Sequence, residues 1–243
     1  MAISYSPKTA TQNLVLYLDA GNVQKSYPGS GTTWTDLSGR NNTATMIGST
    51  PFSTDGGGCF DFATVTGSGG APAANASLGF SFASNMVSTT GSYTFSAWIK
   101  NPPSTSLQVT LLSNAGGGDG YRWGPRLGSV YVLVGPDYTE TGINYSSSLN
   151  SSLWYNIVTV FDRAGSNNGG TPQWQNFING ILDATASMPV SQTASTNATP
   201  GIVRNPCCDL FTGKLAILSV YNKALTPTEI AQNFQALRGR FGI

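Results

Sequence analysis

The chain contains no histidine and few charged residues of either sign. Its 243 residues include 12 Lys and Arg against 11 Asp and Glu, so only 9% are charged and the net charge is +1. Without histidine, a Ser–His–Asp triad, a histidine-ligated zinc site and histidine general-base catalysis are excluded. Because no basic run occurs either, we expect no nucleic-acid partner. An uncharged polar surface instead suits crowded assembly contacts or neutral ligands such as sugars.

Glutamate is almost missing, with Glu140 and Glu229 alone. Glycoside hydrolases need two positioned carboxylates. Nine aspartates remain, which leaves such chemistry open, but no paired-acid motif is visible. We therefore expect a protein that is not an enzyme, and rank a glycan hydrolase or lyase last among the functions considered.

Cysteine is also scarce, with Cys59, Cys207 and Cys208. An odd number, two of them adjacent, is not the disulfide framework of a small secreted domain. We expect small buried side chains, while a bridge from Cys59 to Cys207 or to Cys208 stays open. The first ten residues do not resemble a signal peptide, and no apolar run approaches the ~20 residues that span a bilayer. We therefore expect synthesis in a cytoplasm and no membrane partner.

Short apolar segments separated by Gly, Pro, Asn and Ser recur along the chain, which has 29 Gly and 13 Pro. This pattern predicts an all-β sandwich of two antiparallel sheets. Asn179-Gly180 is the strongest hairpin signal. We expect a loose arm over 1–11 and a single domain over 12–243. The clearest expected strands are 14–19, 92–100, 130–134, 153–162, 173–178, 181–186 and 215–221.

The end of the chain predicts the one confident helix. Thr226 is expected as its N-cap, Pro227 as its first residue, and Glu229 as the partner that closes a capping box. Gly239 is expected to end it. The apolar face that should pack on the β body comprises Ile230, Phe234 and Leu237.

Several of these segments resemble the laminin-G-like or concanavalin A-like lectin/glucanase superfamily, in the same order and spacing. They are YTFSAWIK, LWYNIVTVFD, FINGILDA, FTGKLAILSVY and NKALTPTEIAQNF. The resemblance implies a concanavalin A-like jelly roll. The stretch 14–39 and the tail ALRGRFGI are similar to the form of this domain found in structural proteins of tailed bacteriophages, including cyanophages.

The chain departs from relatives of this superfamily at two points. Relatives with calcium sites often carry acidic residues after Phe-x-Gly, where this chain has Ala216 and Ile217. Calcium is therefore unsupported, and we expect no cofactor. The Glu-x-Asp-x-x-Glu motif of laminarinase-like relatives has no counterpart, which argues against hydrolysis.

A glycine-rich loop supplies the main candidate ligand site. An acid, two aromatic rings and a guanidinium could together bind a sugar, and the loop contains Asp119, Tyr121, Arg122 and Trp123. The alternative is that Tyr121 and Trp123 are packed strand residues beside an ordinary turn. Trp174 is a second candidate platform, with cross-strand packing as its alternative.

Other tryptophans and aspartates have structural explanations. We expect Trp34, Trp98 and Trp154 in the core. Four aspartates close strands at loops, where they could supply calcium ligands but are explained more simply as turn formers. They are Asp19, Asp36, Asp137 and Asp162.

These observations lead to two function classes besides the enzyme. The first is an accessory structural protein exposed on a tailed-phage virion, as capsid decoration or tail fibre, which docks on other virion proteins and forms homo-oligomers. The second is an adhesion module that binds cell-surface glycans. The virion localisation follows from the resemblance, while the low charge suits both classes.

Overall fold

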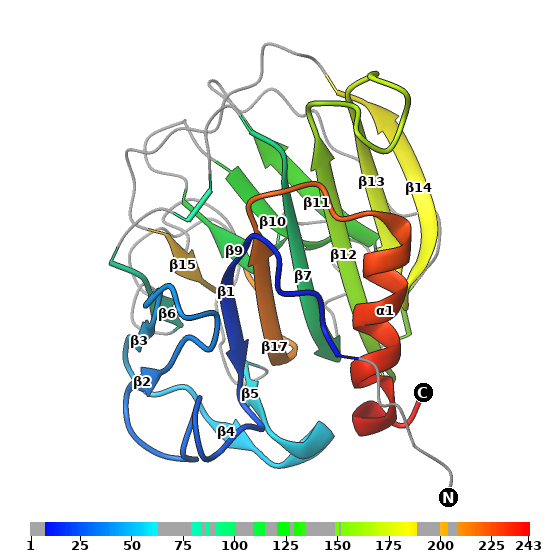
Figure 1. The fold of residues 1–243 in the computed structure, drawn as a ribbon. Helices are drawn as coiled ribbons and strands as arrows, with labels where there is room; N and C mark the ends of the chain where they lie inside the picture. The colour runs from blue at the N-terminus through cyan, green and yellow to red at the C-terminus, as the bar shows by residue number, and fades with distance from the viewer. Residues whose placement is uncertain are drawn as a thin grey trace, which may run out of the picture.

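A computed structural model describes residues 8–62, 79–83, 86–87, 91–100, 109–114, 121–126, 129–134, 149–150, 152–188, 200–203 and 209–243. In this part of the chain an eight-stranded and a seven-stranded sheet pack face to face (Figure 1). Every strand pairing within these two sheets is antiparallel. The architecture confirms the all-β jelly-roll sandwich expected from the sequence.

The larger sheet carries the longest strands. Its spatial order is β14 (Ile181–Ser187), β13 (Gln173–Ile178), β12 (Trp154–Asp162), β7 (Tyr93–Lys100), β17 (Lys214–Tyr221), β5 (Cys59–Asp61) and β4 (Phe52–Ser53). An eighth strand, β1 (Leu14–Asp19), also pairs with β17, along the residues that follow those paired with β5.

The smaller sheet lies behind it. Its order is β11 (Ser129–Val134), β10 (Tyr121–Arg126), β9 (Leu112–Ser113), β15 (Gly201–Ile202), β6 (Phe80–Ser81), β3 (Ala44–Met46) and β2 (Thr33–Trp34). A short parallel pair joins β8 (Val109–Thr110) to β16 (Asp209–Leu210).

The main core fills the space between the sheets. On β7, alternate side chains point into it, as the period-two pattern predicts. Phe95 contacts the rings of Tyr121 and Trp123 from the facing sheet at centroid distances of 5.0 and 5.6 Å. The β7 residues in this core are Tyr93, Phe95, Ala97 and Ile99.

The outer face of the larger sheet is covered by α1 (Pro227–Leu237), the one α-helix among the described residues (Figure 1). Ile230 and Phe234 are its buried residues. Trp98 points to this side of β7 and stacks on Phe241 at 4.1 Å. Covering both faces explains why β17 is buried along nearly its whole length. No helix among the described residues is long and apolar enough to cross a membrane.

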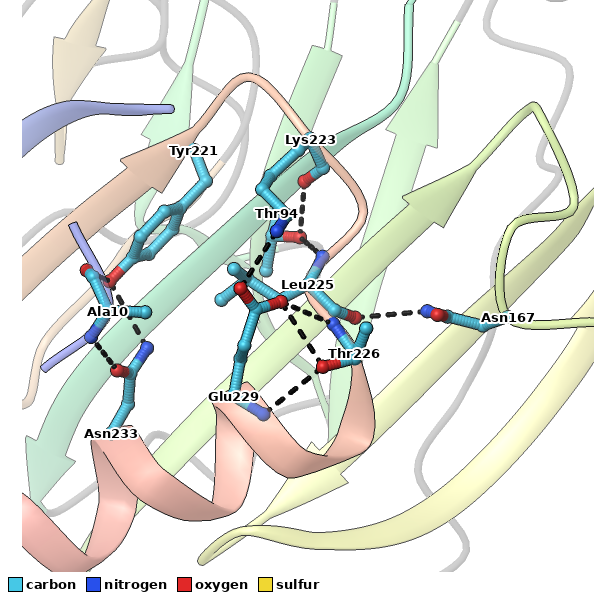
Figure 2. A network of polar contacts seen from close by, with 9 residues as sticks. All are labelled: Ala10, Thr94, Asn167, Tyr221, Lys223, Leu225, Thr226, Glu229 and Asn233. Carbon is cyan, nitrogen blue, oxygen red and sulfur yellow. Dashed lines mark hydrogen bonds and ion pairs between the residues drawn. The ribbon is translucent and has the colours of Figure 1, made fainter. Parts of the chain in front are cut away.

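The start of α1 confirms the predicted capping box (Figure 2). The Glu229 backbone N–H donates to Thr226 Oγ1 at 3.2 Å, and the Thr226 N–H donates to Glu229 Oε2 at 2.9 Å. Lys223 Nζ also donates to Glu229 Oε1 at 2.8 Å. The first turn is thus closed by side chains from within four residues of it, which is why the sequence alone could locate it.

Long-range hydrogen bonds fasten the same turn to the sheet (Figure 2). Thr94 Oγ1 accepts from the Leu225 N–H and donates to the Lys223 carbonyl. Asn167 Nδ2 donates to the Leu225 carbonyl at 3.0 Å. Further along α1, Asn233 accepts from the Ala10 N–H, so the end of the expected arm lies against the helix.

The α-helix ends at Leu237, close to the expected stop at Gly239, but Gly239 does not form a left-handed cap. Beyond Leu237 the chain tightens into the 3-10 helix η3 (Arg238–Phe241), and Gly242, not Gly239, takes the left-handed conformation with φ of 73°. The reason is tertiary. Phe241 packs on Trp98, and Arg240 Nε donates to the carbonyl of Gly56 at 2.6 Å, which pulls the tail onto the 3-10 helix η1 (Asp55–Gly57).

Candidate functional site

The aromatic residues of the predicted sugar site lie in the core. Tyr121 and Trp123 lie on β10, and neither ring is exposed to solvent. Trp123 Nε1 donates to Thr159 Oγ1 at 2.9 Å across the sandwich. Burial raises the pKa of Tyr121, so its phenol stays neutral. The packing alternative accounts for both rings.

The other predicted site residues are not gathered around a surface site either. Trp174 is 2% exposed and packs edge-on against Phe161, its cross-strand partner, at 4.3 Å. Arg122 is also buried. Asp119 lies outside the described residues. The structure therefore offers no sugar-binding ring face from Tyr121, Trp123 or Trp174.

Three of the four loop aspartates form turns, as the simpler explanation predicts. Asp19 accepts from the Gly21 N–H at 2.9 Å. Asp162 accepts from the two N–H groups of residues 166 and 167. Asp36 accepts from the N–H groups of Ser38 and Asn42. Asp137 lies outside the described residues. Within the parts of the chain that the structure describes, no group of three Cys, Asp or Glu side chains is placed to hold a metal ion.

A polar hollow, which sequence reasoning missed, lies where β1 begins and β17 ends. It is open to solvent and has a volume of about 430 Å³. Part of its wall comes from Asn13, just before β1, and Asn222, just after β17. A hydrogen bond of 2.9 Å from the Asn222 N–H to the Asn13 carbonyl joins these two residues. The lining residues are Asn13, Val15, Arg40, Asn42, Met86 and Asn222.

The 38–42 turn, which links β2 to β3, supplies the central wall of the hollow. Its shape is set by the buried carboxylate of Asp36, which is 8% exposed. This carboxylate accepts from the Tyr17 N–H, from the Ser38 N–H and Oγ, and from the Asn42 N–H, at 2.7 to 3.0 Å. Charge-assisted bonds of this kind are stronger than neutral ones, so they fix the backbone of the turn that carries Arg40.

A β-bulge completes the floor of the hollow. The register between β1 and β17 shifts between Leu14 and Leu16, which leaves Val15 without a regular partner. Its carbonyl instead accepts from Asn42 Nδ2 at 2.7 Å and from Ser38 Oγ at 3.1 Å. The irregularity thereby ties the 38–42 turn to the first strand.

The hollow presents donors and acceptors but no carboxylate. The side chains of Asn13, Arg40 and Asn222 are exposed and have no partner among the described residues. Amides offer two donors and an acceptor, and guanidinium offers five donors. With half-buried Val15 and buried Met86 as apolar surface, the arrangement has the chemistry to bind a polyhydroxylated ligand.

The sequence contained one signal for this site. The run Ser38-Gly39-Arg40-Asn41-Asn42 reads as a turn, and the structure confirms it, with φ of 80° at Gly39 and 57° at Asn41. Nothing in the sequence shows that residues near 13, 86 and 222 join it.

Comparison with known proteins identifies the fold family. The Laminin_G_3 family, described as the concanavalin A-like lectin/glucanases superfamily, matches residues 74–231, more than half of the chain. No curated protein is similar in sequence.

Solved structures match nearly the entire chain. The binding domain of Paraclostridial mosquitocidal protein 1 has a TM-score of 0.68 and 16% identity, over 91% of this chain and 52% of that one. The binding domain of botulinum neurotoxin DC in complex with SialylT has a TM-score of 0.65 and 14% identity, over 93% and 52%. Botulinum neurotoxin type C, whose cell entry depends on interaction with two ganglioside molecules, has a TM-score of 0.66 and 14% identity, over 93% and 51%.

At these identities the likeness shows the fold, and the chain spans about half the length of the structures that it matches. The family match and the double-sheet architecture agree. This chain therefore belongs to the Laminin_G_3 family of concanavalin A-like lectin/glucanase domains.

Proposed function

We propose that this chain is a non-catalytic binding module that recognises a glycan through the hollow at Asn13, Arg40 and Asn222. One observation carries the proposal. Exposed amide and guanidinium groups without partners line a hollow whose wall is held in place by the buried carboxylate of Asp36. Because the backbone of the 38–42 turn is held before a ligand arrives, ordering this wall costs little on binding.

The size and chemistry of the hollow suit a sugar. About 430 Å³ falls within the usual range of small-molecule sites. Hydroxyl groups both donate and accept, so the amides of Asn13 and Asn222 can serve them, while Val15 and Met86 face the apolar side of a ring. The solved structures of similar fold support a binding role, since they are binding domains, one in complex with SialylT.

The hollow contains no aromatic ring among its lining residues, so each copy should bind weakly. Weak sites gain strength when several are presented together, because later contacts form at a high effective concentration. A homo-oligomeric or particle-bound setting would therefore suit the module.

A glycan array probed with the labelled protein tests the proposal. Asn222→Ala should reduce binding to every glycan that the parent chain binds. Asn168→Ala, which removes an exposed amide that does not line the hollow, should leave binding unchanged. No binding to any glycan, or equal effects of the two variants, would contradict the proposal.

Docking on a virion is a second candidate function. It is favoured by β14, the terminal strand of the larger sheet, which exposes Ile181 (73%) and Leu182 (47%). Among the described residues no strand pairs with its outer edge. Exposed apolar groups on an unpaired edge suit protein contacts. The resemblance of residues 14–39 and of the tail ALRGRFGI to phage structural proteins suggests a virion as the place where these contacts form.

Electron microscopy of purified tailed-phage particles, with and without this protein, tests the virion role. Extra density at symmetry-related positions is expected only in its presence. Identical particles from which the chain is absent would reject the role.

A further inference from the structure

The geometry points to a glycan with an anionic substituent, a carboxylate or a sulfate, as the ligand of the hollow, with Arg40 as the residue that selects it. This inference rests on the proposed function and narrows it to acidic sugars. It concerns the one charged residue that lines the hollow.

Arg40 has the properties of a ligand-binding cation. Its side chain is exposed and forms no ion pair or hydrogen bond among the described residues. Its own backbone is fixed, because the Arg40 N–H donates to Ser38 Oγ at 3.2 Å and Ser38 is bonded in turn to Asp36. The turn therefore fixes the backbone from which the Arg40 side chain extends, and the donors of its guanidinium stay available.

The neighbouring charges leave this cation uncompensated. Asp36 is the nearest carboxylate along the chain, but its two oxygens accept four hydrogen bonds from Tyr17, Ser38 and Asn42. None of the described residues that line the hollow carries a carboxylate. Some other cations of this chain are paired, as Arg240 is with Asp19 and Lys214 with Asp55, whereas Arg40 lies in a hollow and forms no ion pair among the described residues. The charge of Arg40 is therefore available to an anionic group of a ligand.

Guanidinium chemistry defines the ligand class. Its planar fork donates two parallel hydrogen bonds to an oxyanion that presents two oxygens. Carboxylated and sulfated sugars both present such a group, and the amides of Asn13 and Asn222 remain for ring hydroxyls. A neutral sugar would use Arg40 only as an ordinary donor, so we expect about tenfold weaker binding, equivalent to the loss of one charge-assisted bond.

The experiment compares polysaccharides that differ in charge. The full chain is titrated with dextran, polygalacturonate and dextran sulfate, which are neutral, carboxylated and sulfated. Arg40→Gln removes the charge, Arg40→Lys keeps it without the fork, and Arg238→Gln removes an equally exposed charge that does not line the hollow. We expect an acidic polymer to bind about tenfold more tightly than dextran, and Arg40→Gln to abolish this preference.

Each outcome decides a point. A preference for one acidic polymer that Arg40→Gln abolishes supports the inference and shows whether carboxylate or sulfate is the ligand. Equal binding of dextran and the acidic polymers, sensitive to Asn222→Ala, leaves the proposed function standing and overturns the inference. An acidic preference that Arg238→Gln reduces as much as Arg40→Gln reflects general charge attraction and also overturns it. Binding to none of the three overturns the inference, while the proposed function is then decided by the glycan array.

Discussion

The carboxylate of Asp36 contacts no ligand position, yet four hydrogen bonds from Tyr17, Ser38 and Asn42 converge on it. These bonds convert a glycine- and asparagine-rich turn into a fixed wall. The three lining residues with free polar groups, Asn13, Arg40 and Asn222, are exposed and can be replaced one by one. The residue beneath them determines whether they stand in the right places.

Asp36→Asn should therefore disrupt both the turn and binding. The new NH2 group faces N–H donors and leaves at least one of them unsatisfied, so we expect a loss of about 2 kcal/mol in the free energy of unfolding. Urea denaturation measures the loss, and glycan titration measures the weakened binding. Ser38→Ala, which removes a single hydroxyl from the same network, should cost about half as much. Equal stability of Asp36→Asn and the parent chain would show that the carboxylate does not organise the turn.

Cys59 is a second residue with a simple consequence. It is a free, fully buried cysteine, and burial raises the pKa of its thiol to about 11. Thiolate is the reactive form, so the native protein should not react at this position. Cys207 and Cys208 lie outside the described residues, and because Cys59 is free, the structure does not bear out a bridge from it to either of them.

Thiol counting with a chromogenic disulfide reagent tests this expectation. The native parent chain and a Cys59→Ala variant should react to the same extent. After unfolding in denaturant, the parent should show one more reactive thiol than the variant. A native parent chain that already shows the extra thiol would contradict the burial of Cys59.

Among the secondary-structure elements, α1 is the most self-sufficient. Burial opposes ionisation of Glu229, but hydrogen bonds from Lys223 and Thr226 outweigh it and lower the pKa of the carboxyl below its ordinary value. The capping box is thus charged at neutral pH. It stabilises the N-terminus of the helix, where backbone N–H groups have no intrahelical acceptor.

Thr226→Ala should cost about 1 kcal/mol of unfolding free energy, because it removes the side-chain acceptor of the cap. Thr228→Ala changes a threonine in the same turn that is exposed and makes no side-chain hydrogen bond among the described residues. It should leave stability unchanged or raise it slightly, since alanine is the better helix former. Thermal unfolding followed by circular dichroism distinguishes the two, and equal melting temperatures would count against the cap.

The turn before β5 depends on close backbone approach. Gly58 has φ of 131°, and a Cβ placed on it would lie 2.6 Å from the Cα of Gly21 and 2.9 Å from the Ala20 carbonyl oxygen. Neither contact can be relieved by a side-chain rotation. Only glycine fits at this position, where the turn meets the end of β1.

Gly58→Ala should destabilise the protein by about 3 kcal/mol through combined backbone strain and overlap. Gly31→Ala provides the matched control. That residue also has a positive φ, 92°, but a Cβ there would meet nothing within 4 Å. We expect the control to cost only about 1 kcal/mol. Equal costs in urea denaturation would show that the close approach to Gly21 is unimportant.

At the scale of the whole molecule, an ion-pair cluster around Asp55 joins segments that are distant in the sequence. Asp55 accepts from Lys100 at 3.1 Å, from Lys214 at 2.8 Å and from Trp154 Nε1 at 3.3 Å. Burial alone would raise the pKa of Asp55, but these hydrogen bonds outweigh it and hold the pKa at about 2, against an ordinary value of 3.8. The cluster binds η1 to the two central strands of the larger sheet.

This lowered pKa predicts an acid-dependent stability. A carboxyl whose folded pKa is lowered contributes fully above its unfolded value, about 3.8, and loses that contribution as the pH falls to about 2. Asp55→Asn should lose about 1 to 2 kcal/mol at neutral pH. Its deficit relative to the parent chain should shrink through this window. Urea denaturation at several pH values measures both curves, and a deficit that stays constant down to pH 2 would contradict the ion-pair role.

The sequence could predict features that depend on neighbouring residues. The strand at 14–19, the hairpin at Asn179-Gly180 and the capping box at Thr226 are all encoded within a few positions, and the structure confirms them. Features that depend on distant contacts were missed. Alternation cannot show that both faces of β10 are covered, so Tyr121 and Trp123 were open to two interpretations.

The hollow was beyond prediction for the same reason. It joins the 38–42 turn to a bulge at Val15 and to a backbone bond between Asn222 and Asn13, more than two hundred residues apart in the chain. The secondary-structure propensities of neighbouring residues predict neither the bulge at Val15 nor the hydrogen bond between Asn222 and Asn13. The 3-10 helix η3, which follows α1 and ends before Gly242, likewise depends on packing of Phe241 on Trp98.

Strand β17 runs from the ion-pair cluster around Asp55 to the hollow at Asn222. Its first residue, Lys214, bonds to Asp55 close to η3, where the chain ends, and its last residue precedes Asn222 in the hollow. Eight extended residues span about 25 Å. A tether attached at Ile243 would therefore leave from the end of the sandwich remote from the hollow. On a sensor chip, or on any larger scaffold to which the chain is attached at Ile243, every copy would point the hollow outward.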